Sequence, residues 1–225
     1  GGYNTALGTQ ALYSNTTASN NTAVGYQAGY SNTTGAYNDA FGYQALFGQS
    51  GLSTGSYNTA LGRQALYVNT TGTLNLAAGQ AALYSNTSGS YNVALGTQAL
   101  LSNTTANNNT AVGYQAQYTN QTGTYNTSVG FQSLYTSNRT DGASYNTGIG
   151  AYAGYSMASG TNSTFVGYQS GYYQLGSVNT GIGNQALYGA SGTSSGNYNT
   201  ALGVQSLYSN TTASNNTAVG YQAGY

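Results

Sequence analysis

Few side chains in this 225-residue chain could carry acid–base, nucleophilic or metal chemistry. Its charged residues are Asp39, Asp141, Arg63 and Arg139, and it has no His and no Cys. General acid–base catalysis needs a histidine or carboxylates that act together, and the two aspartates lie roughly six repeat units apart. A hydroxyl nucleophile would have no base to activate it, and zinc sites need His or Cys ligands. The sequence predicts no enzyme, no metal site and no other cofactor.

The low charge also argues against two classes of partner. The formal net charge is +0, whereas binding to nucleic acid or to an anionic membrane depends on clusters of Lys and Arg. No stretch approaches the roughly 18 apolar residues of a membrane helix. We therefore expect neither nucleic-acid binding nor membrane insertion of this segment.

Asn-x-Ser/Thr triplets, which accept N-linked sugars in secreted proteins, are abundant. A chain this rich in Asn and Thr also forms such triplets by chance, but sugars on the turns would keep an uncharged protein dispersed. The candidate glycosylation sites are Asn15, Asn32, Asn69, Asn86, Asn103, Asn120, Asn138 and Asn210.

Two further sets of side chains could bind a ligand from a solvent-facing position. One is a set of tyrosines that could stack on sugars: Tyr26, Tyr43, Tyr114, Tyr168 and Tyr221. The other is a row of threonines that could order water, as in ice-binding solenoids, although Asp39, Leu76 and Val93 interrupt that row. Ring stacking and the strand preference of Thr explain both sets better than ligand binding does.

A repeated unit must position these side chains. The stretch NTAVGYQAGY at Asn21–Tyr30 recurs through the whole chain, and its glycine, which we call the landmark glycine, marks about thirteen units. Most successive gaps between landmark glycines are 17 residues, one is 16 and three are 20. A fixed period near twenty residues is typical of a solenoid. The landmark glycines are Gly8, Gly25, Gly42, Gly62, Gly79, Gly96, Gly113, Gly130, Gly150, Gly167, Gly183, Gly203 and Gly220.

Other residue types keep a constant distance from the landmark glycine. An Asn precedes it by four residues, with Ser163 as the exception, a Gln usually follows by two, and a Tyr usually follows by five. In a solenoid, each constant position becomes a column in which Asn and Gln bond to the next coil and Tyr rings stack. The predicted structural ladders contain Asn4, Asn21, Asn38, Asn58, Asn92, Asn109 and Asn146, then Gln27, Gln44 and Gln64, then Tyr30, Tyr67 and Tyr84.

Seventeen residues is too short for a helix-pair repeat. Val, Ile, Thr and Tyr between Gly, Asn and Ser clusters favour short strands joined by turns. The predicted fold is all-β: a parallel β-solenoid of about thirteen 17-residue coils, each with two strands of about four residues. Charges are rare because a column of like charges about 4.8 Å apart would repel along its whole length.

Residues 1–225 show no linker and are expected to form one repeat solenoid, an excerpt of a longer fibre. The three longer gaps place their extra residues in one turn, at Gly48–Ser56, Thr136–Ser144 and Gly189–Asn197. Both faces of each strand carry apolar or small residues, as in Ala23 beside Val24. One face is expected to fill the coil and the other is a candidate contact for a neighbouring chain.

YNTALG at Tyr3–Gly8 and Tyr57–Gly62, and YNVALG at Tyr91–Gly96, resemble the head repeats of YadA-like trimeric autotransporter adhesins. The wider NTAVGYQAL…SNTTG pattern is similar to repeats in phage tail fibres and bacterial surface fibres. The resemblance implies a left-handed parallel β-roll, a homotrimer and an extracellular fibrous role.

The functional expectation is a structural segment of an extracellular filament, located outside the cell, on its surface or in a virion fibre. The alternatives are an adhesin head or fibre tip that binds a host receptor or glycan, and an ice-binding solenoid. The expected partners are copies of the same chain, in a homotrimer or a filament, with glycans as the other candidate.

Overall fold

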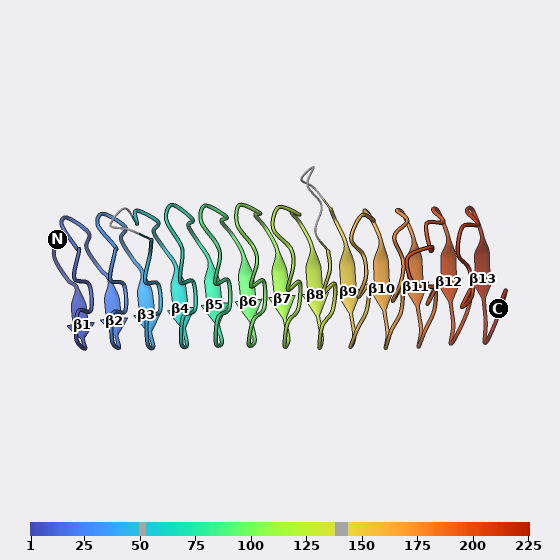
Figure 1. Cartoon of the computed structure of the whole chain (residues 1–225), viewed down its shortest axis with the longest axis horizontal. Coiled ribbons are helices and arrows are strands. Elements are labelled where there is room, and N and C mark those ends of the chain that lie inside the picture. The colour runs from blue at the N-terminus through green and yellow to red at the C-terminus, as the bar shows by residue number, and fades with distance from the viewer. Residues whose placement is uncertain (50–52, 138–143) are drawn as a thin grey trace. The chain divides into compact units, whose positions relative to one another are not determined.

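The computed structural model describes residues 1–49, 53–137 and 144–225, and within them every regular element is a β-strand. The chain forms two compact units, unit 1 (Gly1–Asn109) and unit 2 (Thr110–Tyr225). Both units have the same architecture, in which a three-residue strand recurs once per repeat (Figure 1). The spacing of the sequence repeat is unchanged where unit 1 ends and unit 2 begins. The expectation of one solenoid over residues 1–225 stays a prediction.

In each unit the strands lie side by side in sequence order and parallel, with residues of equal phase paired. Thr5, Ala6 and Leu7 pair with Thr22, Ala23 and Val24, for example. Unit 1 contains β1 (Thr5–Leu7), β2 (Thr22–Val24), β3 (Asp39–Phe41), β4 (Thr59–Leu61), β5 (Leu76–Ala78) and β6 (Val93–Leu95). Unit 2 contains β7 (Thr110–Val112), β8 (Thr127–Val129), β9 (Thr147–Ile149), β10 (Thr164–Val166), β11 (Thr180–Ile182), β12 (Thr200–Leu202) and β13 (Thr217–Val219). The predicted parallel β-solenoid is confirmed.

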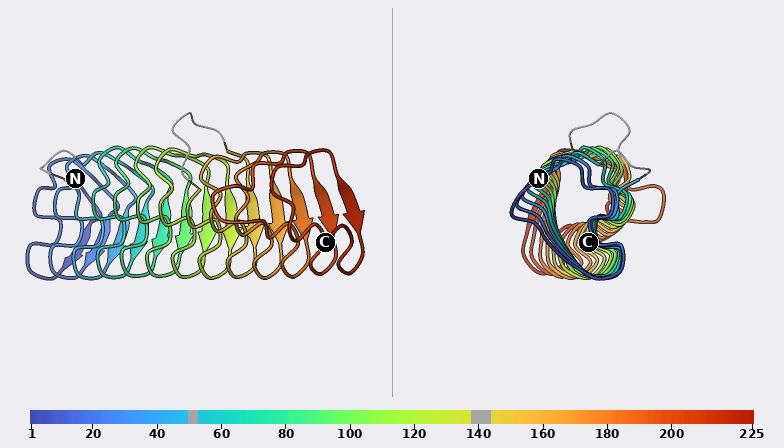
Figure 2. Two further views of the ribbon diagram at one scale, coloured as in Figure 1. Left: turned by 45° about the vertical axis from the view of Figure 1, so that its right-hand side comes forward. Right: turned by 90° about the vertical axis from the view of Figure 1, so that its left-hand side faces the viewer.

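The prediction of two strands per coil is wrong. The Gln-Ala-x-Tyr stretch is a turn, because alternate residues have left-handed backbone conformations, such as Gln27 with φ 53° and Gly29 with φ 61°. An extended strand needs φ near −120° at every residue. The turns still bond to the next coil, since the N–H of Gly29 donates to the carbonyl of Ala45 at 2.9 Å. Figure 2 shows these turns stacked on one another within each unit.

The middle residue of each strand points into the coil and its two neighbours point outward. Ala23, Ala40 and Ala60 are buried, whereas the flanking Phe41 and Leu61 are exposed. A second buried column comes from the turn and contains leucines such as Leu66. The interior of a 17-residue coil is narrow, so alanine and one leucine per coil fill it in most of unit 1.

Of the three longer turns, only Gly189–Asn197 lies wholly within the described residues. Its backbone is closed by Ser194, whose Oγ accepts a hydrogen bond from the N–H of Ala190 at 2.6 Å. Ser194 also forms an isolated parallel bridge with Gln174 of the preceding coil. This turn therefore remains tied to the coil that it extends. Arg139 and Asp141, and parts of the other two longer turns, lie outside the described residues.

Replacing Val178 by Asn is expected to raise the free energy of unfolding by about 1 kcal/mol, because a β-branched residue is strained in the left-handed region and Asn tolerates it. Val178 has φ 59° and is 42% exposed. The same position of other coils carries asparagines with φ between 54° and 62°, at Asn20, Asn108, Asn162 and Asn215.

The denaturant midpoint measures this gain. Val204→Asn is the matched control, since Val204 is equally exposed but is not among the residues with positive φ. Equal shifts for the two variants would contradict the explanation.

Candidate functional site

The described residues contain no group of three or more His, Cys, Asp or Glu side chains that could hold a metal ion. They also contain no helix long and apolar enough to cross a membrane. Asp39 and Arg63, the two charged side chains in the described part of the chain, are both exposed. The candidate functional features are therefore the columns of neutral side chains that the coils align.

The asparagine column four residues before the landmark glycine is a buried hydrogen-bonded ladder. The backbone N–H of Asn38 donates to Oδ1 of Asn21 at 2.8 Å, and that of Asn58 donates to Oδ1 of Asn38 at 2.9 Å. Nδ2 of Asn58 donates to the carbonyl of Gly72 at 2.9 Å. Each side chain thus joins two coils and braces a turn. The same backbone-to-Oδ1 bonds link Asn4 to Asn21 and Asn92 to Asn109 in unit 1, and join Asn146 to its neighbours in unit 2.

Ser163 shows which part of this ladder the solenoid keeps when Asn is absent. The Oγ of Ser163 accepts the N–H of Asn179 at 3.0 Å, and its own N–H donates to Oδ1 of Asn146 at 3.1 Å. The shorter side chain preserves the acceptor for the next coil, and its hydroxyl donates to the carbonyl of Thr161 at 3.1 Å.

Replacing Asn75 by Ala is expected to cost about 2 kcal/mol, because the buried backbone N–H of Asn92 would lose its acceptor. That N–H donates to Oδ1 of Asn75 at 3.0 Å. Asn75→Ser should cost less than half as much, as Ser163 provides the same acceptor. Chemical denaturation of both variants tests this order, and an equal loss would show that the acceptor is not what the column supplies.

Most of the candidate glycosylation sites form a second asparagine column that the structure places inside the coil. Asn32, Asn69, Asn86, Asn103 and Asn120 are at most 2% exposed. In each of them, and in Asn15 and Asn210, Nδ2 donates to the carbonyl three residues ahead, at 2.8 to 3.3 Å. A sugar on Nδ2 would need that nitrogen in solvent, so glycosylation at the five buried asparagines does not fit the folded coil. Asn15 and Asn210 are partly exposed, and glycosylation there stays a prediction. Asn138 lies outside the described residues.

The sequence contained a signal for this second ladder. A Gly or Ala follows the asparagine by three residues, as in Asn32 and Gly35 or Asn69 and Gly72. At Gly72 a Cβ would lie 2.4 Å from both Oδ1 of Asn69 and the carbonyl of Gly89, whereas the coil of Asn103 closes the same turn with Ala106 at this position. Reading the Asn-Thr-Thr-Gly stretch as a solvent-exposed turn hid this role.

The glutamine column lies at the surface, and its ladder consists of bonds from one side-chain amide to the next. Nε2 of Gln27 donates to Oε1 of Gln10 at 2.7 Å, Gln44 donates to Gln27 at 2.9 Å, and Gln64 donates to Gln44 at 3.2 Å. The described part of unit 2 repeats the pattern from Gln169 to Gln222. The predicted Gln27, Gln44 and Gln64 do lie in one ladder.

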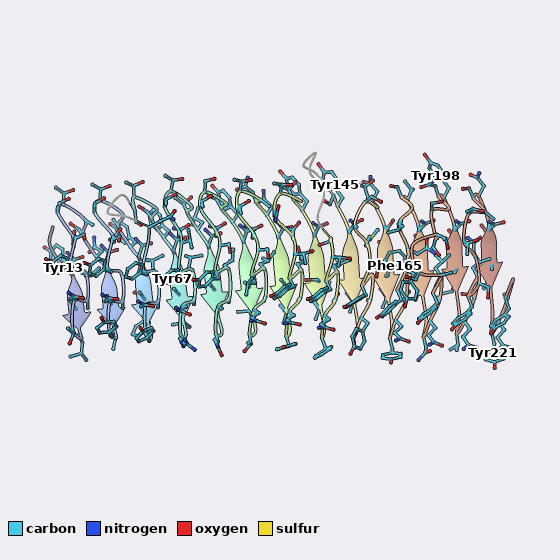
Figure 3. The ribbon with its side chains drawn as sticks, in the orientation of Figure 1. Tyr13, Tyr67, Tyr145, Phe165, Tyr198 and Tyr221 are labelled. Carbon is cyan, nitrogen blue, oxygen red and sulfur yellow. The ribbon has the colours of Figure 1, made fainter. Side chains whose placement is uncertain are left out.

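The aromatic column five residues after the landmark glycine, which we call the tyrosine column, is a continuous stack in each unit. Ring centroids are 4.9 to 5.3 Å apart and adjacent planes differ by at most 20°. Figure 3 labels Tyr13 and Tyr67 among these side chains. Unit 1 stacks Tyr13, Tyr30, Phe47, Tyr67 and Tyr84, and unit 2 stacks Tyr118, Tyr135, Tyr155, Tyr172, Tyr188, Tyr208 and Tyr225.

The tyrosines considered for sugar stacking are exposed, but several of them use their ring faces within the protein. Tyr26 stacks on Tyr43 at 5.3 Å, and Tyr114 stacks on Phe131 at 5.3 Å. Tyr168 instead meets the ring of Tyr152 edge-on at 6.2 Å. A sugar ring needs a free aromatic face, so the stacked pairs present mainly their edges to a ligand.

Tyr152 creates an aromatic cluster in unit 2. It occupies the glutamine position of its coil and contacts Phe131 at 5.2 Å and Tyr155 at 5.8 Å, both edge-on. Its ring therefore contacts both the tyrosine column, at Tyr155, and the neighbouring column of exposed rings, at Phe131. It does so in the coil where the glutamine ladder is interrupted. The pKa of Tyr172 is raised to about 12, mainly by burial and then by the nearby phenols, of which Tyr155 has the largest effect.

This shift predicts a loss of stability at alkaline pH. Tyrosine in an unfolded chain ionises near pH 10, whereas Tyr172 in the folded protein keeps its proton until about pH 12. Between these values the unfolded state binds fewer protons than the folded state, so the free energy of unfolding falls as pH rises. The denaturant midpoint of the wild-type protein should fall as pH rises through this interval, and the midpoint of Tyr172→Phe should fall less steeply. A Tyr172→Phe variant with the wild-type slope would contradict this source of pH dependence.

In each unit the outward side chains of the strands form two columns, which we call the strand face. One column is formed by the first residue of each strand and is threonine in all seven strands of unit 2. The other is formed by the third residue and is apolar, with Leu61, Val129, Ile149, Ile182 and Leu202 each 38 to 45% exposed. The residues that interrupt the threonine row, Asp39, Leu76 and Val93, all lie in unit 1.

Comparisons with protein-family models, curated proteins and solved structures give no match to this chain. The resemblance to trimeric adhesin heads and tail fibres therefore stays a prediction.

Proposed function

We propose that this chain is a structural segment of an extracellular filament, in which copies associate laterally through the strand face. The observation that carries the proposal is the constant register of every column. Hydrogen-bonded and stacked columns join each coil to the next in both units, whereas the described residues contain no group of three or more His, Cys, Asp or Glu side chains that could hold a metal ion. A scaffold of this kind resists extension and proteolysis because its backbone bonds are repeated at every coil.

The strand face supports lateral association with a second copy. Contiguous exposed apolar surface on a soluble protein marks an interaction site, and here an apolar side chain projects from every strand of unit 2. The face of unit 2 carries no charge that would repel an identical face. Because each copy repeats with the same coil spacing, side chains of two copies can remain in register along the contact.

Sedimentation and electron microscopy of the full chain test the association. The wild-type chain should form oligomers or filaments, and the double variant Ile149→Glu, Ile182→Glu should remain monomeric. Both side chains point outward, so the coil itself has room for Glu. Asn184→Glu is the matched control, because Asn184 is exposed on a turn beside the same coils, and it should assemble normally.

A monomeric wild-type chain, or equal assembly of the double variant, would overturn lateral association through this face. Surface labelling of native material with an antibody would test the extracellular location separately. A discrete head on a stalk in the micrographs would favour the receptor- or glycan-binding alternative.

Ice binding is a second candidate for the same face, favoured by the unbroken threonine column of unit 2. Seven threonines at one phase, each two residues from an apolar side chain, present a regular array of hydroxyl and methyl groups. The two proposals exclude each other, because a face covered by another copy cannot bind ice. A monomeric protein with thermal hysteresis that Thr164→Lys abolishes would favour ice binding over assembly.

A further inference from the structure

Tyrosine is the main oxidisable side chain that this protein exposes. The chain has 25 Tyr, no Cys, no Trp and no His, and its one methionine, Met157, is buried. Oxidants act on sulfur side chains and on the electron-rich aromatic rings, and accessibility decides which of these groups react. An oxidant at the surface of this chain therefore reacts at tyrosine.

The tyrosine column holds phenol rings in pairs that suit covalent coupling. Tyr67 and Tyr84 have centroids 4.9 Å apart and planes that differ by 7°, and both are partly exposed. Their neighbours in the column are Phe47, which stacks on Tyr67, and Leu101, so within the column these two phenols have no other phenol beside them. In unit 2, seven consecutive phenols stack in the same way, with Tyr155 and Tyr172 4.9 Å apart.

We propose that the tyrosine column is a site of oxidative cross-linking, in which neighbouring coils become joined by dityrosine bonds. The oxidant is hydrogen peroxide acting through a haem peroxidase. Each of two phenols gives up one electron and one proton, and the resulting phenoxyl radicals couple through the ring carbons ortho to the oxygens. The two ortho hydrogens then move as protons to the ring oxygens, which restores both phenols, and one peroxide is reduced to two waters. The pair becomes lighter by two hydrogen atoms.

The cross-link forms within one chain and needs no second copy, so it is independent of the proposed lateral association. A bond between Tyr67 and Tyr84 closes a covalent loop of one repeat. Such a closure removes conformational freedom from the unfolded chain, as a disulfide does. Oxidation should therefore raise the denaturant midpoint of a protein that has no cysteine with which to form disulfides.

The experiment treats the dilute full chain with a haem peroxidase and hydrogen peroxide. Dityrosine fluorescence should appear with a yield per chain that does not change on dilution, and mass spectrometry after proteolysis should find the Tyr67 and Tyr84 peptides linked. Tyr67→Phe should abolish that linked peptide without unfolding the protein, because Phe47 already occupies this column between Tyr30 and Tyr67.

Tyr91→Phe is the matched control. Tyr91 is more exposed than Tyr67, but the residues at its phase in the adjacent coils are Leu74 and Asn108, so it has no phenol on which to stack. Its replacement should leave the Tyr67–Tyr84 product unchanged. Cross-links that form only between chains, that include Tyr91 as often as Tyr84, or that are absent while a free tyrosine derivative couples in the same reaction would overturn the proposal.

Discussion

Replacing Gly79 by alanine is expected to cost at least about 3 kcal/mol of folding stability, enough to unfold part of the protein at room temperature. Gly79 has φ +136°, far from the left-handed region near +57° that other residues adopt in turns. A Cβ at this position would lie 2.5 Å from the carbonyl oxygen of Gly96 and 2.6 Å from its carbonyl carbon. Both contacts are to backbone, so no side chain can move aside to relieve them.

Within each unit the landmark glycines recur because each lies over the next. The N–H of Gly79 donates to the carbonyl of Leu61, and that of Gly96 donates to Ala78, both at 2.8 Å. Moving one glycine away from the next would break these bonds, which join successive coils.

The matched control for Gly79→Ala is Gly192→Ala in the described longer turn of unit 2. Gly192 has φ +72°, and a Cβ there meets no atom within 4 Å. The control should therefore lose only about 1 kcal/mol from backbone conformation. Circular dichroism followed during denaturation measures both variants. Similar losses would show that close stacking of the glycines is not the cause.

The columns could be predicted from the sequence because a repeat fixes the phase of every residue. Asn21, Asn38 and Asn58 had to lie over one another once the parallel solenoid was accepted. The direction in which each side chain points could not be predicted, because Ala23 and Val24 are both apolar. The structure places the small Ala23 inside, and the space beside it is filled by Leu12 of the preceding coil, which lies against Gly29 of the turn.

The second strand was predicted wrongly for a different reason. Gln27, Leu66 and Tyr57 have positive φ although none of these residue types favours it. Closing a coil in 17 residues requires sharp left-handed corners, and the hydrogen bonds between coils stabilise them. That requirement comes from the whole coil and leaves no trace in the local propensity of a Gln or a Leu.

In one coil of unit 2, a large side chain on the strand takes the place of the leucine that the turn usually supplies. This exchange supports the last prediction. Phe165, labelled in Figure 3, is the largest fully buried side chain and occupies the strand position that is alanine in most coils. The turn of the same coil has Gly171 where Leu66 lies in another coil. A Cβ on Gly171 would overlap the ring of Phe165, and the paired residue Gly181 would place its Cβ 3.1 Å from Cδ1 of that ring. The phenyl ring therefore fills the space that a turn leucine fills elsewhere.

Phe165→Ala should cost about 3 to 5 kcal/mol, because it removes the ring and leaves a cavity that rigid stacked coils cannot close. Gly171→Leu alone should also be strongly destabilising, since the new side chain meets the ring. The double variant recreates the combination of Ala60 with Leu66, and the backbone permits it, as Gly171 has φ 62° and Leu66 has φ 53°. It should be more stable than either single variant, a non-additivity that a double-mutant cycle measures directly. If the two losses simply add, the ring and the turn do not share one space, and the apparent exchange between strand and turn is a coincidence of the sequence.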